Sequence, residues 1–148
     1  MIEETLWQIY QHSYFQSTCR VMPCQTVTGH RAGAIISLWN PHGKNLTLAH
    51  NKRLERAAMR YLRAQGIAYK RLWGGNEDMS YRELSIFVPC SLQQAQHLST
   101  HFKQLAFYYV SVRERVSLHC SKQTKPMCFI SKHLKKRWLV RHGRISLF

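Results

Sequence analysis

Acidic residues are scarce in this sequence. Only 7 Asp and Glu stand against 22 Lys and Arg, so the formal net charge at pH 7 is +15. Catalysis by paired carboxylates therefore has few side chains to use. The excess of positive charge produces a long-range field that attracts phosphates, so RNA, the ribosome and an anionic membrane surface are the candidate partners. A basic surface without a specific partner is the alternative explanation.

Long apolar runs and known catalytic motifs are also missing. No run of about 18 apolar residues occurs, so we expect no transmembrane helix. Residues 1–11 are acidic and then amphipathic, which is not the pattern of a secretory signal. We therefore expect a cytoplasmic protein. The sequence contains no phosphate-binding loop, nucleophile elbow or dinucleotide fingerprint, which favours binding over catalysis.

The cysteines lack the spacing of a zinc site. There are five, and Cys19 and Cys24 form a single loose pair with His30 beyond it. Structural zinc sites usually show two tight ligand pairs. His97 and His101 stand four residues apart, but no acidic partner joins them. We expect reduced thiols, and neither a metal nor another cofactor.

Hydrophobic periodicity predicts one α+β domain over residues 1–148, with a core at about 33–112. The core order is strand, helix, strand, strand, helix, strand, which predicts a ferredoxin-like two-layer sandwich. In this fold the sheet is antiparallel and both helices cover one face. We expect the terminal segments to cover the other face. The predicted strands are 34–41, 68–73, 81–89 and 105–112, the helices are 47–65 and 91–103, and a basic C-terminal extension over 122–148 is helical around 130–140.

Two cationic segments carry the functional prediction. Along the first predicted helix the basic residues recur at steps that place them on one side, where phosphate contacts release counterions. In the tail, basic residues flank a tryptophan that can stack on a base. A solvated helix face and simple docking of the tail on the body are the alternatives. The predicted nucleic-acid-binding residues are Lys52, Arg53, Arg56, Arg60, Arg63, Lys132, Lys135, Lys136, Arg137, Trp138, Arg141 and Arg144.

Short motifs within the core resemble a known family. They are AIISLWNP at residues 34–41, Asn51, Glu83 and HFKQLAFYYV at residues 101–110. This set resembles the bacterial domain of unknown function numbered three-two-nine-three, over roughly residues 33–110. Ser37 replaces the family's threonine and Lys103 replaces its glycine. The resemblance implies a bacterial protein and supplies no established activity.

The resemblance also indicates a polar group formed by Asn40, Asn51, Glu83 and Gln104. These side chains can meet at one edge of the sheet. One interpretation is structural: the amides and the carboxylate satisfy backbone groups. The other is a pocket for a small molecule or an enzymatic reaction, to which the basic surface attracts a phosphorylated ligand.

The sequence thus predicts a basic module that binds RNA, either free or on the ribosome, through sequence-independent phosphate contacts. Two alternatives stay open. The first is the small-molecule or enzymatic pocket at the polar group. The second is an adaptor whose basic tail docks on an acidic protein partner.

Overall fold

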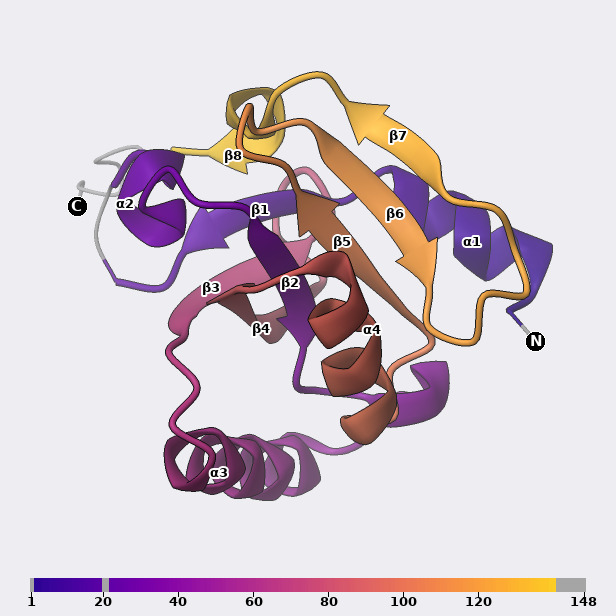
Figure 1. Cartoon of the computed structure of the whole chain (residues 1–148). Coiled ribbons are helices and arrows are strands. Elements are labelled where there is room, and N and C mark those ends of the chain that lie inside the picture. Colours follow the sequence, from indigo (N-terminus) through magenta and orange to yellow (C-terminus); the bar gives the residue numbers. More distant parts are fainter. Residues whose placement is uncertain (1, 20–21, 141–148) are drawn as a thin grey trace, which may run out of the picture.

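The computed structural model describes residues 2–19 and 22–140, and within them eight strands form one mixed sheet. The strands are β1 (Tyr14–Ser17), β2 (Gly33–Ser37), β3 (Lys70–Gly75), β4 (Arg82–Pro89), β5 (Ala106–Val110), β6 (Val116–Cys120), β7 (Cys128–Ser131) and β8 (Trp138–Leu139). Their spatial order is β7-β6-β5-β2-β4-β3-β1-β8, and the sheet curls into a half-barrel (Figure 1). Neighbouring strands are antiparallel except β1 and β8, which are parallel.

Four α-helices and two short 3₁₀ helices occur in the same described residues. They are α1 (Glu4–Gln11), α2 (Cys24–Thr28), η1 (Pro41–Gly43), α3 (Leu48–Ala64), α4 (Leu92–His101) and η2 (Leu134–Arg137). Across residues 2–19 and 22–140, no helix has the length and apolar character needed to span a bilayer.

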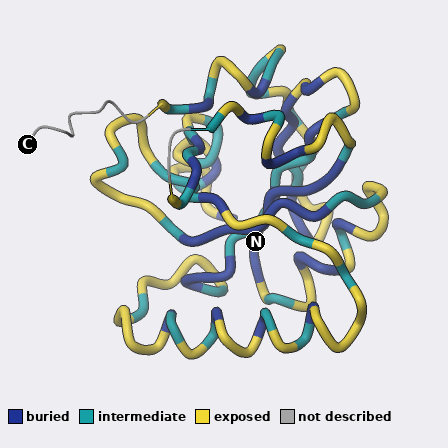
Figure 2. Tube along the Cα trace, turned by 90° about the vertical axis from the view of Figure 1, so that its left-hand side faces the viewer, coloured by how far each residue is buried: buried dark blue, intermediate teal, exposed yellow. Residues whose placement is uncertain are grey.

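Helices α3 and α4 pack on one face of the sheet (Figure 1). The inward residues Ala58 and Leu62 of α3 and Ala95 and Leu98 of α4 contact the strand residues that alternate toward them, such as Ile86. Each buried leucine or isoleucine side chain contributes about 1.5–3 kcal/mol. Along α3 the buried positions recur every three or four residues, and the positions between them are half-buried or exposed (Figure 2). The outer side of α3 is thus left for charged residues.

The terminal segments cover the opposite face, as the sequence predicted. Phe15 of β1, Val27 of α2 and Leu134 of η2 bury Phe87 of β4 in a second apolar cluster. Helix α1 forms a third cluster through Trp7. Because Phe87 is completely buried, this face does not present it as an open platform for bases.

The predicted ferredoxin-like two-layer sandwich is wrong. The predicted core strands and helices form close to their expected positions, but strands outside that core extend the sheet on both sides and curl it. On one side β6 and β7 follow β5, and on the other β1 and β8 follow β3. A strand edge carries unpaired backbone N–H and C=O groups, and these additional strands satisfy them.

The predicted basic C-terminal helix is also wrong. Residues 130–140 instead form the end of β7, the short η2 and the strand β8. Leu134 and Trp138, which helical spacing placed on one side, are both buried, but η2 is a single 3₁₀ turn that leads directly into β8. Pairing of β8 with β1 supplies hydrogen bonds to an edge that a helix would leave open.

Candidate functional site

A cavity of about 710 Å³ lies on the face of the sheet opposite α3 and α4, between α1 and the central strands. Its size falls in the range of about 300–1,000 Å³ that is usual for ligand pockets. Strands β2 to β5 form its floor, and α1 forms one wall. The floor and wall side chains include Leu6, Ile9, Tyr10, Ile35, Ser37, Ser85, Ala106 and Tyr108.

Two asparagines of the predicted polar group bind each other beside this cavity. The Asn40 backbone N–H donates to Asn51 Oδ1 at 2.9 Å, and Asn51 Nδ2 donates back to Asn40 Oδ1 at 3.0 Å. Asn40 Oδ1 also accepts from the backbone N–H of Leu46 at 2.8 Å. Asn40 adopts the left-handed conformation, with φ of 51°, directly before Pro41. Asparagine tolerates this conformation, so it can turn the chain from β2 toward α3.

Glu83 receives three hydrogen bonds at the edge of the cavity. Ser37 Oγ donates to its Oε1 at 2.7 Å, and Asn40 Nδ2 donates to its Oε2 at 2.9 Å. The Tyr81 hydroxyl also donates to Oε2. Asn40 therefore joins Asn51 to Glu83 in one network. Ser37 and Glu83 reach each other because β2 and β4 pair directly, with Ser37 opposite Ser85.

Three tyrosine hydroxyls lie within electrostatic reach of Glu83. Burial, with a smaller contribution from the Glu83 charge, raises the pKa of Tyr10 to about 12. Burial and Glu83 also raise the pKa of Tyr81 and of Tyr108 above the ordinary tyrosine value. The Tyr108 hydroxyl additionally donates to the Tyr10 carbonyl at 2.8 Å. All three hydroxyls stay protonated near neutral pH, so they offer hydrogen bonds rather than charge.

Gln104 completes the predicted polar group. It is buried, lines the cavity, and donates from Nε2 to the Trp39 carbonyl at 3.0 Å. The Trp39 indole in turn donates to Glu55 Oε1 of α3 at 3.2 Å. The four residues therefore lie close together: Asn40, Glu83 and Gln104 line the cavity, and Asn51 supports Asn40 from behind. The amides satisfy backbone groups and also border an open volume.

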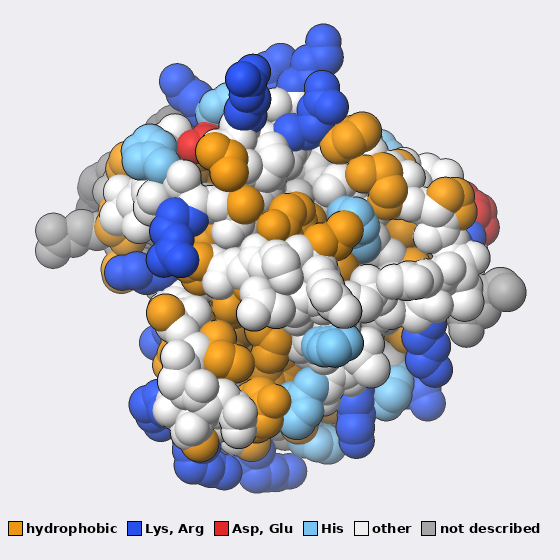
Figure 3. All heavy atoms as spheres, viewed as in Figure 1, with side chains coloured by type: hydrophobic (Ala, Val, Ile, Leu, Met, Phe, Trp, Pro, Cys, Tyr) orange, Lys and Arg blue, Asp and Glu red, His pale blue; other side chains and the backbone are white. Residues whose placement is uncertain are grey.

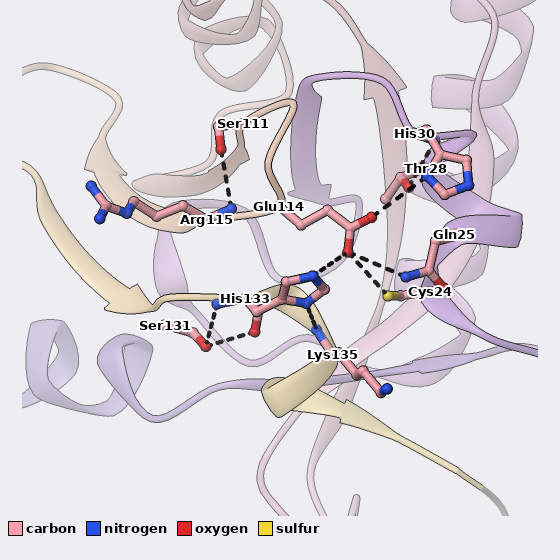
Figure 4. Close-up of polar contacts among 10 residues, drawn as sticks. All are labelled: Cys24, Gln25, Thr28, His30, Ser111, Glu114, Arg115, Ser131, His133 and Lys135. Carbon is pink, nitrogen blue, oxygen red and sulfur yellow. Dashed lines mark hydrogen bonds and ion pairs between the residues drawn. The ribbon is translucent and has the colours of Figure 1, made fainter.

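A second polar cluster surrounds Glu114 in the turn between β5 and β6 (Figure 4). Its carboxylate is buried and accepts from Gln25 Nε2 at 3.4 Å and from Cys24 Sγ at 3.7 Å. His133 Nε2 lies 3.2 Å and His30 Nδ1 lies 3.9 Å from its oxygens. A backbone hydrogen bond also joins η2 to this turn: the Leu134 N–H donates to the Glu114 carbonyl at 2.7 Å. The cluster therefore ties α2 and η2 to the β5–β6 turn.

The Cys24 thiol in this cluster is not activated. Burial, followed by the Glu114 charge, raises the pKa of Cys24 to about 11. A nucleophilic cysteine needs the opposite shift, because the thiolate is the reactive form. Among the described residues, no group of three or more His, Cys, Asp and Glu side chains is arranged to hold a metal ion. The Glu114 cluster is therefore best explained as a structural connection.

The arginines predicted on α3 form one exposed face. Arg53, Arg56, Arg60 and Arg63 are all exposed, and none forms an ion pair with an acid in the described part of the chain. Lys52 differs from them, since it is half-buried and lies 3.7 Å from Glu55 Oε1. The α3 face therefore presents guanidinium groups that the fold leaves unneutralised.

The predicted tail residues divide into two kinds. Lys132, Lys135 and Lys136 are exposed. The Arg137 guanidinium instead donates to the carbonyls of Gln11, Ser13 and Ile130 at 2.7–3.0 Å. Trp138 is buried and donates from its indole to the Met22 carbonyl at 2.7 Å. Arg137 and Trp138 thus fasten the tail to the body, while Arg141 and Arg144 lie outside the described residues.

The two cationic surfaces lie at opposite ends of the molecule. Helix α3 forms the lower end in Figure 1, and η2 lies at the upper end beside β8. In the space-filling view blue side chains gather at the upper and lower ends, and a further group lies at the left side (Figure 3). A single short stretch of phosphates in one groove therefore cannot contact both sets.

Sequence reasoning missed the tyrosines and the α1 wall of the cavity. Tyr81 stands two residues before Glu83, so the alternation of a strand places both side chains on one side, and this spacing was a usable indication. Tyr10 and Tyr108 lie 98 residues apart in the sequence and meet only in the fold. Helix α1 also precedes the region of the family motifs, so those motifs gave no reason to include it.

Comparison with known families confirms the resemblance over the core. Residues 36–107 match the family model described as "Protein of unknown function (DUF3293)". This span includes Asn40, Asn51, Glu83 and Gln104. No curated protein and no solved structure matches the chain.

Proposed function

We propose that this chain, whose residues 36–107 match the DUF3293 family, binds a small molecule in the cavity between α1 and the sheet. One observation carries the proposal. Asn40, Glu83 and Gln104 come from three separate motifs of the family resemblance, and all three line the same cavity. Convergence of a few polar groups on a mostly apolar cavity is the usual composition of a ligand site.

A purely structural role explains only part of this network. Asn51 is buried behind Asn40 and supports the turn from β2 to α3. Glu83, however, is half-buried at the rim of an open volume, together with Ser37 and Tyr81. A carboxylate needed only for packing gains nothing from facing a cavity. Its placement favours contact with a ligand.

Cavity filling gives a direct test. Ala106 of β5 lines the cavity, so Ala106→Phe reduces its volume, whereas Ala57→Phe adds the same ring to the exposed side of α3. We expect some members of a varied small-molecule set to raise the Tm of the wild type and of Ala57→Phe but not that of Ala106→Phe. Stabilisation of all three proteins by the same compounds would contradict the proposal.

RNA binding is a second candidate, and the exposed α3 face supports it. Four arginines without acidic partners in the described residues lie along one helix, which suits sequence-independent phosphate contacts. The opposite placement of the tail lysines makes α3 the primary surface. Contact with the ribosome belongs to this candidate, while an anionic membrane or an acidic protein partner stays a weaker prediction. A cytoplasmic location and a bacterial source remain part of the proposal.

Charge removal on α3 tests this candidate. We expect Arg56→Gln with Arg60→Gln to weaken binding to mixed RNA and to lower the slope of log K against log salt by about 1 for each phosphate that the helix no longer neutralises. Lys132→Gln with Lys136→Gln removes the same charge at the other end of the molecule and serves as the control. Equal weakening by both pairs would show that net charge, and not the α3 face, determines binding.

A further inference from the structure

We propose that the ligand of the cavity is a protonated amine attached to an apolar body. This inference rests on the proposed function and adds the chemical class of the ligand. The sequence suggested a phosphorylated ligand, attracted by the basic surface. The side chains that line the cavity favour the opposite charge.

Within residues 2–19 and 22–140, the cavity lining contains no lysine and no arginine, although the whole sequence has 22 of them. Its acidic member is Glu83, whereas an anionic ligand requires guanidinium, ammonium or clustered N–H donors. The tyrosine hydroxyls around Glu83 are neutral, as described above. The lining also contains His12, which is exposed at the C-terminal end of α1.

Glu83 retains the capacity to accept a hydrogen bond from a ligand. A carboxylate offers about four lone-pair positions. Ser37 occupies one on Oε1, and Asn40 and Tyr81 occupy two on Oε2. One position on Oε1 therefore remains for a further donor. An ammonium group is suited to it, because it is a donor without an acceptor and carries the complementary charge.

The rest of the cavity is suited to an apolar body. Leu6, Ile9, Phe15 and Ile35 line it together with the rings of Tyr10, Tyr81 and Tyr108. Aromatic rings attract organic cations through their negative faces and also pack against hydrocarbon. An amine on an aromatic or aliphatic body therefore suits both the Glu83 carboxylate and the apolar and aromatic side chains of the lining.

The positive charges of the protein do not reverse this preference. Arg137 lies behind Ser13 at the cavity wall, but its guanidinium donates to the carbonyls of Gln11, Ser13 and Ile130. The arginines of α3 lie on the other face of the sheet (Figure 1). Exposed charges beyond about 8–10 Å are largely screened at physiological salt, so contact with Glu83 dominates.

Three ligands with one indole body test the inference: tryptamine (a cation), tryptophol (neutral) and indole-3-acetate (an anion). We expect the wild type to bind tryptamine at least tenfold more tightly than indole-3-acetate in calorimetric titrations, with tryptophol between them. Glu83→Gln should reduce the difference to less than threefold, while Ala57→Phe should leave it unchanged. The wild-type comparison needs no variant, so the test holds even if Glu83→Gln fails to fold.

The outcomes separate the two proposals. Equal or tighter binding of indole-3-acetate, or no binding of tryptamine at millimolar concentration, overturns the amine inference. In either of these cases, loss of the neutral or anionic ligand in Ala106→Phe would show that the cavity remains the ligand site and only the ligand class is wrong. If Ala106→Phe changes no binding at all, the proposed function fails as well.

Discussion

At the scale of single residues, Cys19 and Cys24 are five positions apart but differ in chemistry. Cys19 is exposed, whereas Cys24 is 2% exposed and has a pKa raised to about 11. We expect iodoacetamide at pH 8 to alkylate Cys19 rapidly and Cys24 only after unfolding, since the thiolate is the reactive form. Mass spectrometry of tryptic peptides measures both sites in one sample. Labelling of Cys24 at the rate of Cys19 would contradict the buried, protonated state.

Asn51 provides a second test at this scale. Its amide satisfies both the backbone N–H and the side-chain oxygen of Asn40, and all these atoms are buried. We expect Asn51→Ala to lower the free energy of unfolding by about 2–3 kcal/mol, because it leaves the buried Asn40 N–H without its acceptor and removes one of the hydrogen bonds to Asn40 Oδ1. Asn45→Ala, at an exposed position of the loop between η1 and α3, should change it by less than about 0.5 kcal/mol. If urea titrations gave both variants the same loss of unfolding free energy, the asparagine pair would have no special role in stability.

At the scale of elements, helix α4 begins with a capping box. Ser91 Oγ accepts from the Gln94 backbone N–H at 3.2 Å, and Gln94 Oε1 accepts from the Ser91 N–H at 2.9 Å. We expect Ser91→Ala to destabilise the protein by about 1 kcal/mol. Thr100→Ala, at an exposed position in the last turn of the same helix, is the control. A thermal or chemical denaturation experiment that gives the two variants the same stability would show that α4 does not depend on its cap.

Elements with strong local patterns were predictable from the sequence. Helices α3 and α4 and strands β2 to β5 lie within a few residues of their predicted bounds, because apolar periodicity and capping residues specify them locally. The C-terminal segment was mispredicted because its spacing fits a helix equally well. What determines its conformation is the open edge of β1 and the carbonyls that Arg137 reaches, and both are distant in the sequence.

The same limit applies to the candidate site. The family motifs drew attention to Asn40, Asn51, Glu83 and Gln104, and the fold brings these residues together at and behind one cavity wall. The wall from α1 and the hydroxyls of Tyr10 and Tyr108 arise from contacts across the whole chain, which no local pattern encodes. Positive charge was the most visible property of the sequence, but the described cavity lining contains Glu83 and no lysine or arginine.

At the scale of the whole molecule, salt distinguishes the two candidate ligands. The net charge of +15 attracts RNA, and we expect that affinity to fall steeply between about 50 and 200 mM salt as counterions compete. The same charge repels a free amine at long range while Glu83 attracts it at short range, so we expect the Kd for tryptamine to change less than about twofold. Titrations of both ligands over this range measure the difference. A decline in tryptamine affinity as steep as that of RNA would contradict a short-range contact with Glu83 inside the cavity.

The parallel pairing of β1 with β8 joins segments from the two ends of the chain. During synthesis, residues 14–17 emerge long before residues 138–139 exist to pair with them. The growing protein therefore carries an unprotected strand edge until residues 138–139 arrive, and such an edge can recruit strands from neighbouring molecules. A chain interrupted shortly before Trp138 should consequently be prone to aggregation, even though its cavity residues are already complete.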